Sequence, residues 1–262
     1  MRHCFFALTF VTTLMTTPVF AQHSDIEFGL DDLMSPAAIE IEVGETTATG
    51  IPFFEGEFEA GFTTEDPGFA TAPDESLNVN AGDAIFARVL DSSSNALFGG
   101  LGYVTFYNPD TDSLEAATGQ ILLEDNAPQT TDVLIDGTSL SGDNPLFVAL
   151  GQIDPNIGEV AAIDAHLDFT LVAGADAPVG AYGIAFELLG SLDGTSLDNF
   201  EVTSDPFFII LNNGLSEEQF EEFAVPAFAE AGAAAVPEPG TLGLLAMGMS
   251  CVILRRSRRR LS

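Results

Sequence analysis

Apolar and polar side chains alternate without a break in Ile163-Asp164-Ala165-His166-Leu167-Asp168-Phe169-Thr170-Leu171. Successive side chains of a β-strand point to opposite faces, so this pattern predicts a strand with one buried and one wet face. The same period of two recurs at residues 39–43, 182–188 and 207–211. The dominant local structure is therefore predicted to be β-strand.

Short runs rich in β-branched and aromatic residues predict further strands at residues 84–90, 103–107, 120–123, 133–135 and 146–150. Clusters of Gly, Pro, Asn and Asp separate these runs and predict mostly short turns. About nine to eleven strands joined in this way predict an all-β fold, namely an antiparallel β-sandwich or a jelly-roll-like arrangement.

One short helix is expected near the end of this β-domain, which spans residues 22–230. Ser216 is the predicted N-cap, and Gln219 closes a capping box three residues later. Pro226 is expected to stop or kink the helix, because proline lacks an N–H and clashes with the preceding turn. The small residues that follow predict a linker at residues 231–236.

Residues 1–21 have the order of parts of a secretory signal peptide. A short positive start is followed by the apolar stretch 4–15, and the small residue Ala21 precedes Gln22 at the predicted cleavage site. We therefore expect the chain to be exported across the inner membrane.

Three features follow one another between residues 237 and 262. Pro237-Glu238-Pro239 comes first, and the uncharged stretch 241–254 follows it. The arginine cluster comes last, and it comprises Arg255, Arg256, Arg258, Arg259 and Arg260. The arginines predict a cytoplasmic end by the positive-inside rule. As a helix, residues 241–254 would measure only ~21 Å, shorter than the ~30 Å hydrocarbon core of a bilayer.

This order of features resembles the PEP-CTERM sorting signal of exported bacterial proteins. The resemblance implies that an exosortase-type membrane peptidase recognises the segment and cleaves it near residues 237–240. It also implies transient anchoring in the membrane, followed by release to the cell surface or the extracellular space. An ordinary C-terminal anchor is the alternative, since a bilayer can thin locally around a short span.

Residues 22–236, which we call the body, carry a charge that excludes nucleic-acid binding. The chain has 40 acidic and 7 basic residues, no lysine, and a formal net charge of −33. Residues 22–236 hold 39 of the carboxylates and Arg88 as their one basic residue, which leaves a net charge of −38 there. Such a body cannot neutralise phosphates, so we expect no nucleic-acid partner. Cations remain candidate partners.

Two histidines remain in the predicted mature chain, and each lies in an alternating polar row. His23 shares a row with Asp25, and His166 shares one with Asp168. If the two rows lie on neighbouring strands, both imidazoles and a carboxylate can surround one ion, and zinc accepts this nitrogen-plus-oxygen ligand set. The alternative is two solvated strand faces in a very acidic protein.

Residues 108–115 have the spacing of oxygen ligands in a calcium loop, with Asn108, Asp110, Asp112 and Glu115 as the candidates. The glycine that such a loop needs at its sharp turn is absent. A hairpin connection between the strands at 103–107 and 120–123 is therefore the preferred interpretation.

Four stretches of the body, at residues 23–27, 65–69, 165–169 and 204–214, are similar to a group of exported PEP-CTERM proteins. In some relatives such bodies are histidine-rich and linked to zinc supply. This chain keeps one histidine at each of the two corresponding places, namely His23 and His166.

The sequence offers no recognisable catalytic constellation. No G-x-S-x-G motif occurs, and Cys4 and Cys251, the cysteines of the chain, lie in the two terminal segments. We therefore expect a non-enzymatic, exported surface or matrix protein with no resident cofactor. An extracytoplasmic module for zinc or calcium is the alternative. A glycan-handling enzyme stays open because carboxylates are plentiful.

Overall fold

The computed structural model describes residues 25–31, 38–41, 45–47, 50–71, 84–92, 100–125, 132–142, 147–152, 164–191 and 202–234. Within these ranges the chain is mostly β-strand, with a 3-10 turn η2 (Gly174–Asp176) and one longer helical segment at residues 217–234. The predicted all-β fold with a short helix late in the chain is therefore confirmed.

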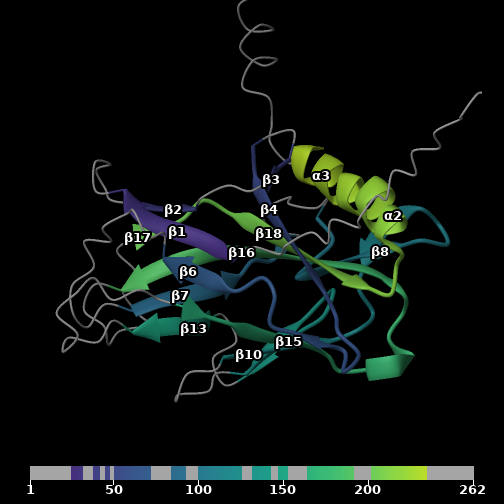
Figure 1. Cartoon of the computed structure of the whole chain (residues 1–262), viewed down its shortest axis with the longest axis horizontal. Helices are drawn as coiled ribbons and strands as arrows, with labels where there is room; N and C mark the ends of the chain where they lie inside the picture. Colours follow the sequence, from purple (N-terminus) through teal and green to yellow (C-terminus); the bar gives the residue numbers. More distant parts are fainter. Residues whose placement is uncertain are drawn as a thin grey trace, which may run out of the picture.

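A nine-stranded sheet forms the centre of the fold (Figure 1). Its main path runs β13 (Phe147–Gln152), β7 (Ala84–Val89), β16 (Gly180–Ser191), β18 (Phe207–Asn213), β4 (Pro52–Glu57) and β3 (Glu45–Thr46). Three further strands join it beside this path, namely β8 (Val104–Asn108), β9 (Ser113–Ala116) and β17 (Val202–Thr203).

Two smaller sheets complete the β-structure. The five-stranded sheet has the order β12 (Leu140–Gly142), β11 (Val133–Ile135), β10 (Ile121–Asp125), β15 (Leu167–Leu171) and β5 (Thr63–Thr64). The four-stranded sheet has the order β14 (Asp164–Ala165), β6 (Phe69–Thr71), β1 (Ile26–Asp31) and β2 (Ala38–Ile41).

One buried core joins all three sheets. The inward side chains of the two smaller sheets, such as Phe69 and Phe169, pack with those of the central sheet, such as Phe186 and Phe207. Phe207 contacts both Phe186, at a ring-centroid distance of 5.8 Å, and Phe69, at 6.2 Å. Burial of this aromatic and aliphatic surface is the main force holding the sheets together.

The helical segment covers the other face of the central sheet. It consists of α2 (Glu217–Gln219), the π-helical turn η3 (Phe220–Ala224) and α3 (Val225–Ala234). Its buried side chains pack on the outward residues of β16 and β18. All seven residues of β18 are consequently buried, because the core lies on one side of this strand and the helix on the other.

Several details differ from the sequence prediction. The described part of the chain forms 18 strands, most of them short, rather than nine to eleven. Most strand pairs are antiparallel as predicted, but β1–β6 and β18–β4 are parallel. A sandwich requires sheets packed around a shared core, and this structure has such an arrangement. Whether the strand topology is that of a β-sandwich or of a jelly roll stays a prediction.

The decisive alternating stretch is not one strand. Residues 164–165 form β14 in the four-stranded sheet, whereas residues 167–171 form β15 in the five-stranded sheet. His166 lies between them, where the chain passes from one sheet to the other. Alternation predicts which side chains are buried, but it carries no information on where a strand changes its partners.

The capping box is present as predicted. Ser216 Oγ accepts a hydrogen bond from the Gln219 backbone N–H, and the Gln219 side chain accepts one from the Ser216 backbone N–H. Of the predicted stop or kink at Pro226, the stop is wrong, because α3 continues to Ala234 and therefore includes the first part of the predicted linker. The π-helical turn before Pro226, in which Val225 N–H bonds Phe220 O, accommodates the proline.

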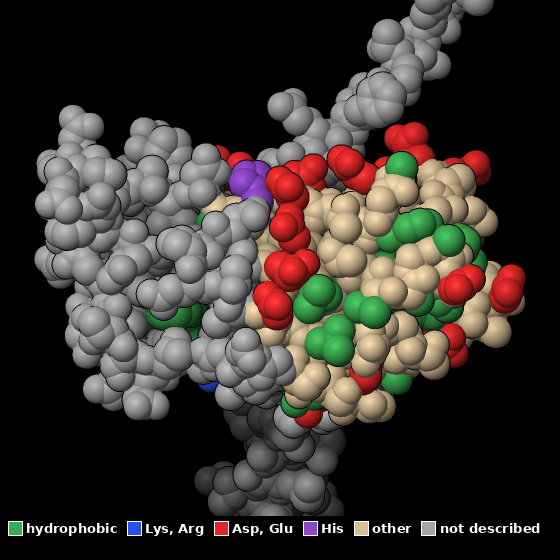
Figure 2. Space-filling view, turned by 90° about the horizontal axis from the view of Figure 1, so that it is seen from below, with side chains coloured by type: hydrophobic (Ala, Val, Ile, Leu, Met, Phe, Trp, Pro, Cys, Tyr) green, Lys and Arg blue, Asp and Glu red, His purple; other side chains and the backbone are tan. Residues whose placement is uncertain are grey.

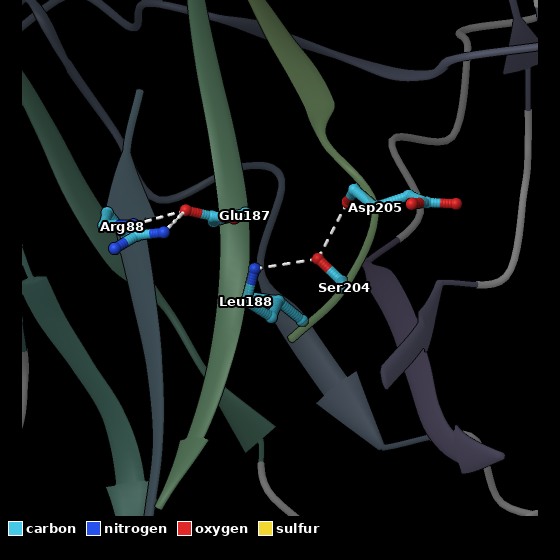
Figure 3. Close-up of polar contacts among 5 residues, drawn as sticks. All are labelled: Arg88, Glu187, Leu188, Ser204 and Asp205. Atoms are coloured by element: carbon cyan, nitrogen blue, oxygen red, sulfur yellow. Dashed lines mark hydrogen bonds and ion pairs between the residues drawn. The ribbon is translucent and has the colours of Figure 1, made fainter. Parts of the chain in front are cut away.

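Polar contacts also support the central sheet (Figure 3). Arg88 on β7 pairs with Glu187, its cross-strand neighbour on β16. Ser204 Oγ accepts a hydrogen bond from Leu188 N–H at 2.9 Å and donates one to Asp205 O at 2.8 Å. This serine therefore satisfies backbone groups where β17 ends.

Candidate functional site

Three separate segments meet at the start of β6. Ile26 on β1 pairs with Phe69 on β6, and Phe69 pairs on its other side with Ala165 on β14. Backbone N–H of Ile26 donates to Gly68 O at 2.7 Å, which joins the start of β1 to the residue before β6. The residues just before β1 and just after β14 therefore flank Gly68.

Asp25 and His166 both approach the backbone of Gly68. A β-carbon added to this glycine would lie 2.7 Å from Asp25 Oδ1 and 2.7 Å from His166 Cε1. It would also lie 2.8 Å from His166 Nδ1. A real β-carbon cannot tolerate contacts this short, so the absence of a side chain at position 68 permits the arrangement.

The imidazole is held from a second direction. His166 Nδ1 lies 3.3 Å from the backbone oxygen of Glu65. If Nδ1 carries the proton in this contact, Nε2 is the unprotonated ring nitrogen, which is the form that can ligate a metal. Glu65 directly follows β5, so the contact comes from the strand beside β15. Backbone groups thus orient the ring that the sequence predicts as a metal ligand.

The structure brings the predicted metal ligands together only in part. Asp25 and His166 meet at Gly68, whereas Asp168 belongs to β15 and lies beside Glu124 of β10. His23 lies outside the described residues. Within the described part of the chain, no three His, Cys, Asp or Glu side chains gather as a metal-binding group.

A row of carboxylates crosses the outer face of the five-stranded sheet. Glu124 on β10 pairs with Asp168 on β15. On its other side, the β10–β11 register ends at the pair Leu123 and Val133, and one further step along it places Asp132 beside Glu124. We call Asp168, Glu124 and Asp132 the acidic row. Figure 2 shows acidic side chains in a column that starts beside the described histidine. The predicted wet faces of these strands are therefore strongly negative.

Residues 108–113 form a tight hairpin, but it does not join the predicted strands: β8 pairs with β9 (Ser113–Ala116), whereas β10 at residues 121–125 belongs to the five-stranded sheet, so the predicted pairing of 103–107 with 120–123 is wrong. Asn108 pairs with Ser113 at the end of β8 and β9. The candidate calcium ligands bond within the hairpin instead: Asn108 Oδ1 accepts from Asp110 N–H at 3.0 Å, and Asn108 Nδ2 donates to Glu115 Oε1 at 3.1 Å. Tyr107 O–H donates to Asp112 Oδ1 at 2.7 Å. Burial, together with this contact, raises the pKa of Tyr107 to about 12.

The contributions of Glu65 and Gly68 could not be derived from sequence spacing. Both lie in the stretch 65–69 that is similar to exported PEP-CTERM proteins, so the similarity was the available signal. The role of Gly68 depends on the parallel pairing of β1 with β6, which joins residues about forty positions apart, and the role of Glu65 depends on the pairing of β5 with β15. Periodicity does not predict such a pairing.

The terminal segments carry the predicted processing and anchoring residues. Ala21, Gln22, the Pro237-Glu238-Pro239 tripeptide and the arginine cluster all lie outside the described residues. Among the described helices, none is long and apolar enough to cross a membrane. The predicted membrane segment 241–254 lies outside that part of the chain.

Comparison with known proteins identifies one segment. A family model described as the PEP-CTERM protein-sorting motif matches residues 235–260. No curated protein and no solved structure gives a significant match. The match covers the predicted tripeptide, the apolar stretch and the arginine cluster in their predicted order. The chain therefore carries a PEP-CTERM protein-sorting motif, which marks it for export through an exosortase-type system.

Proposed function

We propose that this chain is a non-enzymatic protein of the cell surface or extracellular matrix. The observation that carries the proposal is the sorting motif at residues 235–260. It implies transient anchoring in the membrane and recognition by an exosortase, itself a membrane protein. The β-domain is then the part of the chain that remains outside the cell.

The surface of the β-domain supports this role. Arg88, the one basic residue of the body, is already paired with Glu187, while the acidic row faces solvent. A strongly negative surface keeps an extracellular protein soluble and discourages association between copies. It also attracts cations from the surrounding medium.

The test follows the full chain in a bacterial host that has an exosortase-type peptidase. We expect a shortened form, cleaved near residues 237–240, in the surface or extracellular fraction, measured by cell fractionation and mass spectrometry. A variant with Pro237→Ala and Glu238→Ala should remain uncleaved in the membrane fraction. Equal processing of both chains contradicts the proposal, as does a turnover activity abolished by one substitution.

A metal-binding module is the second candidate function. The observation that favours it is the approach of the Asp25 carboxylate and the His166 imidazole to the same point beside Gly68. One carboxylate and one imidazole are two of the four ligands that a structural zinc site needs. His23 is two residues before Asp25 in the sequence and is the proposed third ligand.

Titration calorimetry of the exported protein distinguishes the two candidates. We expect the metal module to bind zinc one-to-one and to lose that binding in His166→Ala and Asp25→Asn. Asp110→Asn is the matched control, because this exposed carboxylate lies in the β8–β9 hairpin. Weak, salt-screened binding at many sites would instead leave the acidic surface protein as the function.

A further inference from the structure

The helical segment is fixed to the β-domain along most of its length. Phe220, Ala224, Val225 and Phe228 are buried against the central sheet, and Phe228 is only 1% exposed. A β-carbon at Gly183 of β16 would overlap the Phe228 ring, so this ring packs directly on the strand backbone. The helix cannot slide or rotate without losing these contacts.

The entry to the helix is fixed as well. The Asn212 side chain accepts a hydrogen bond from Leu215 N–H at 2.9 Å and donates one to Leu215 O at 3.1 Å. Gly214 between them has a positive φ of 77°, which glycine adopts without strain. The capping box then begins the helix at Ser216. Its direction relative to β18 is therefore set at the start.

The sorting motif begins where this helix ends. The described helix reaches Ala234, and the motif match starts at residue 235. Phe228 is the last large apolar side chain before the motif, and Pro237 follows it by nine residues. Six helical residues span ~9 Å and three extended residues at most ~10 Å. Pro237 is therefore tethered within ~20 Å of the sheet.

Charge is distributed unevenly along the helix. The part before α3 has four carboxylates, namely Glu217, Glu218, Glu221 and Glu222. Within α3 there is one, Glu230. Bacterial membrane surfaces are negative, so the end of the helix nearest the motif is also the end that an anionic surface repels least.

We infer that the α3 end of the β-domain is the surface presented to the membrane peptidase, and that residues 229–234 are a spacer whose length limits processing. This inference rests on the proposed recognition of the motif by an exosortase-type peptidase. A folded domain tethered this closely contacts the peptidase while the chain is cut. The spacer supplies the distance that the enzyme needs to engage Pro237.

The test compares full-length chains in the same exosortase-containing host. Deletion of residues 229–232 removes about one helical turn and keeps every buried anchor of the helix. We expect processing, followed by pulse-chase and mass spectrometry, to become at least tenfold slower. Insertion of Gly-Ser-Gly-Ser after Ala234 in the deleted chain should restore the original rate. An unchanged melting temperature in the deletion variant excludes a general folding defect.

The outcomes separate this inference from the proposed function. If the unaltered chain is not processed while a known substrate of the host is, both are overturned. If the unaltered chain is processed and the deletion variant is processed at the same rate, only the spacer inference is overturned. Failure of the Gly-Ser insertion to restore processing also overturns it, because distance alone would then not be limiting.

Discussion

Gly68 shows how one missing side chain shapes the candidate site. Its backbone is approached from one side by a carboxylate before β1 and from the other by an imidazole after β14. Both groups were predicted as ligands because alternation assigned each to a polar strand face. Their meeting point was not predicted, since it depends on how β6 lies between the other two strands.

Alanine at position 68 tests this arrangement. In Gly68→Ala the new methyl group must displace the ends of the Asp25 and His166 side chains, which are half-buried and can move, so we expect a loss of no more than about 1 kcal/mol in the free energy of unfolding. If the metal module exists, zinc affinity should fall too. Urea unfolding and calorimetry measure the two effects.

The matched control for this substitution is Gly61→Ala. A β-carbon at Gly61 would meet only Thr63 Oγ1, at 3.4 Å. We expect stability and metal affinity to stay near those of the unaltered protein. A Gly68→Ala protein that behaves like this control would contradict the close approach described here.

Asp136 is a second residue with a measurable consequence. Partial burial raises the pKa of its carboxyl group, but hydrogen bonds from the backbone and hydroxyl groups of Thr138 and Ser139 outweigh this and lower the pKa to about 2. The folded-state pKa lies below the unfolded value of 3.8. The resulting stability is therefore present above pH 4 and is lost as the pH falls towards 2.

We expect Asp136→Asn to lower the free energy of unfolding by about 1 kcal/mol at pH 7, after allowance for solvent screening. The difference from the unaltered protein should shrink between pH 4 and pH 2. Denaturant unfolding across this range measures it. A difference that does not depend on pH would mean that the carboxylate charge is not the cause.

At the scale of elements, the helix covers one face of strand β18, and this accounts for the absence of polar side chains at residues 207–211. The run Phe207-Phe208-Ile209-Ile210-Leu211 has no polar alternation because both faces of β18 are covered. Such a continuous apolar run is typical of a strand buried on both sides. The sequence pattern thus held a signal for the covering layer, and the prediction of one wet face for residues 207–211 was wrong.

Two phenylalanines of this helix provide a matched pair. Phe228 is 1% exposed and Phe223 is 49% exposed. We expect Phe228→Ala to cost about 3–5 kcal/mol in the free energy of unfolding, whereas Phe223→Ala should change it by no more than about 0.5 kcal/mol. Urea unfolding of both variants measures the difference. Equal costs would contradict the packing of the helix on the central sheet.

At the scale of the whole molecule, like charge opposes the compact state. The body between residues 22 and 236 has a net charge of −38, and the acidic row places carboxylates on adjacent strands. Such self-repulsion is screened by salt. The shared core of three sheets must therefore offset an electrostatic cost that a neutral protein of this size does not have.

Salt should consequently stabilise the protein. We expect the melting temperature to rise by several degrees between ~10 mM and ~500 mM NaCl, as the Debye length falls from about 30 Å to below 8 Å. Scanning calorimetry measures the rise. Calcium chloride at matched ionic strength is the control, since a larger rise with calcium would indicate bound ions rather than screening. A melting temperature independent of salt would contradict the electrostatic cost.

The sequence by itself determined features that depend on local order along the chain. Alternation predicted strands and their buried faces, the capping box predicted the helix start, and the order of features after Pro237 predicted the sorting motif. These properties depend only on residues that are close in the sequence, so they can be predicted without the structure.

Only the tertiary structure decided which segments far apart in the sequence contact one another. The change of sheet at His166, the parallel pairing that places Asp25 beside Gly68, and the helix layer over β18 each join parts far apart in the sequence. Such pairings are selected by the burial of one shared core, in which each sheet excludes water from the others. Only the folded chain brings those surfaces into contact.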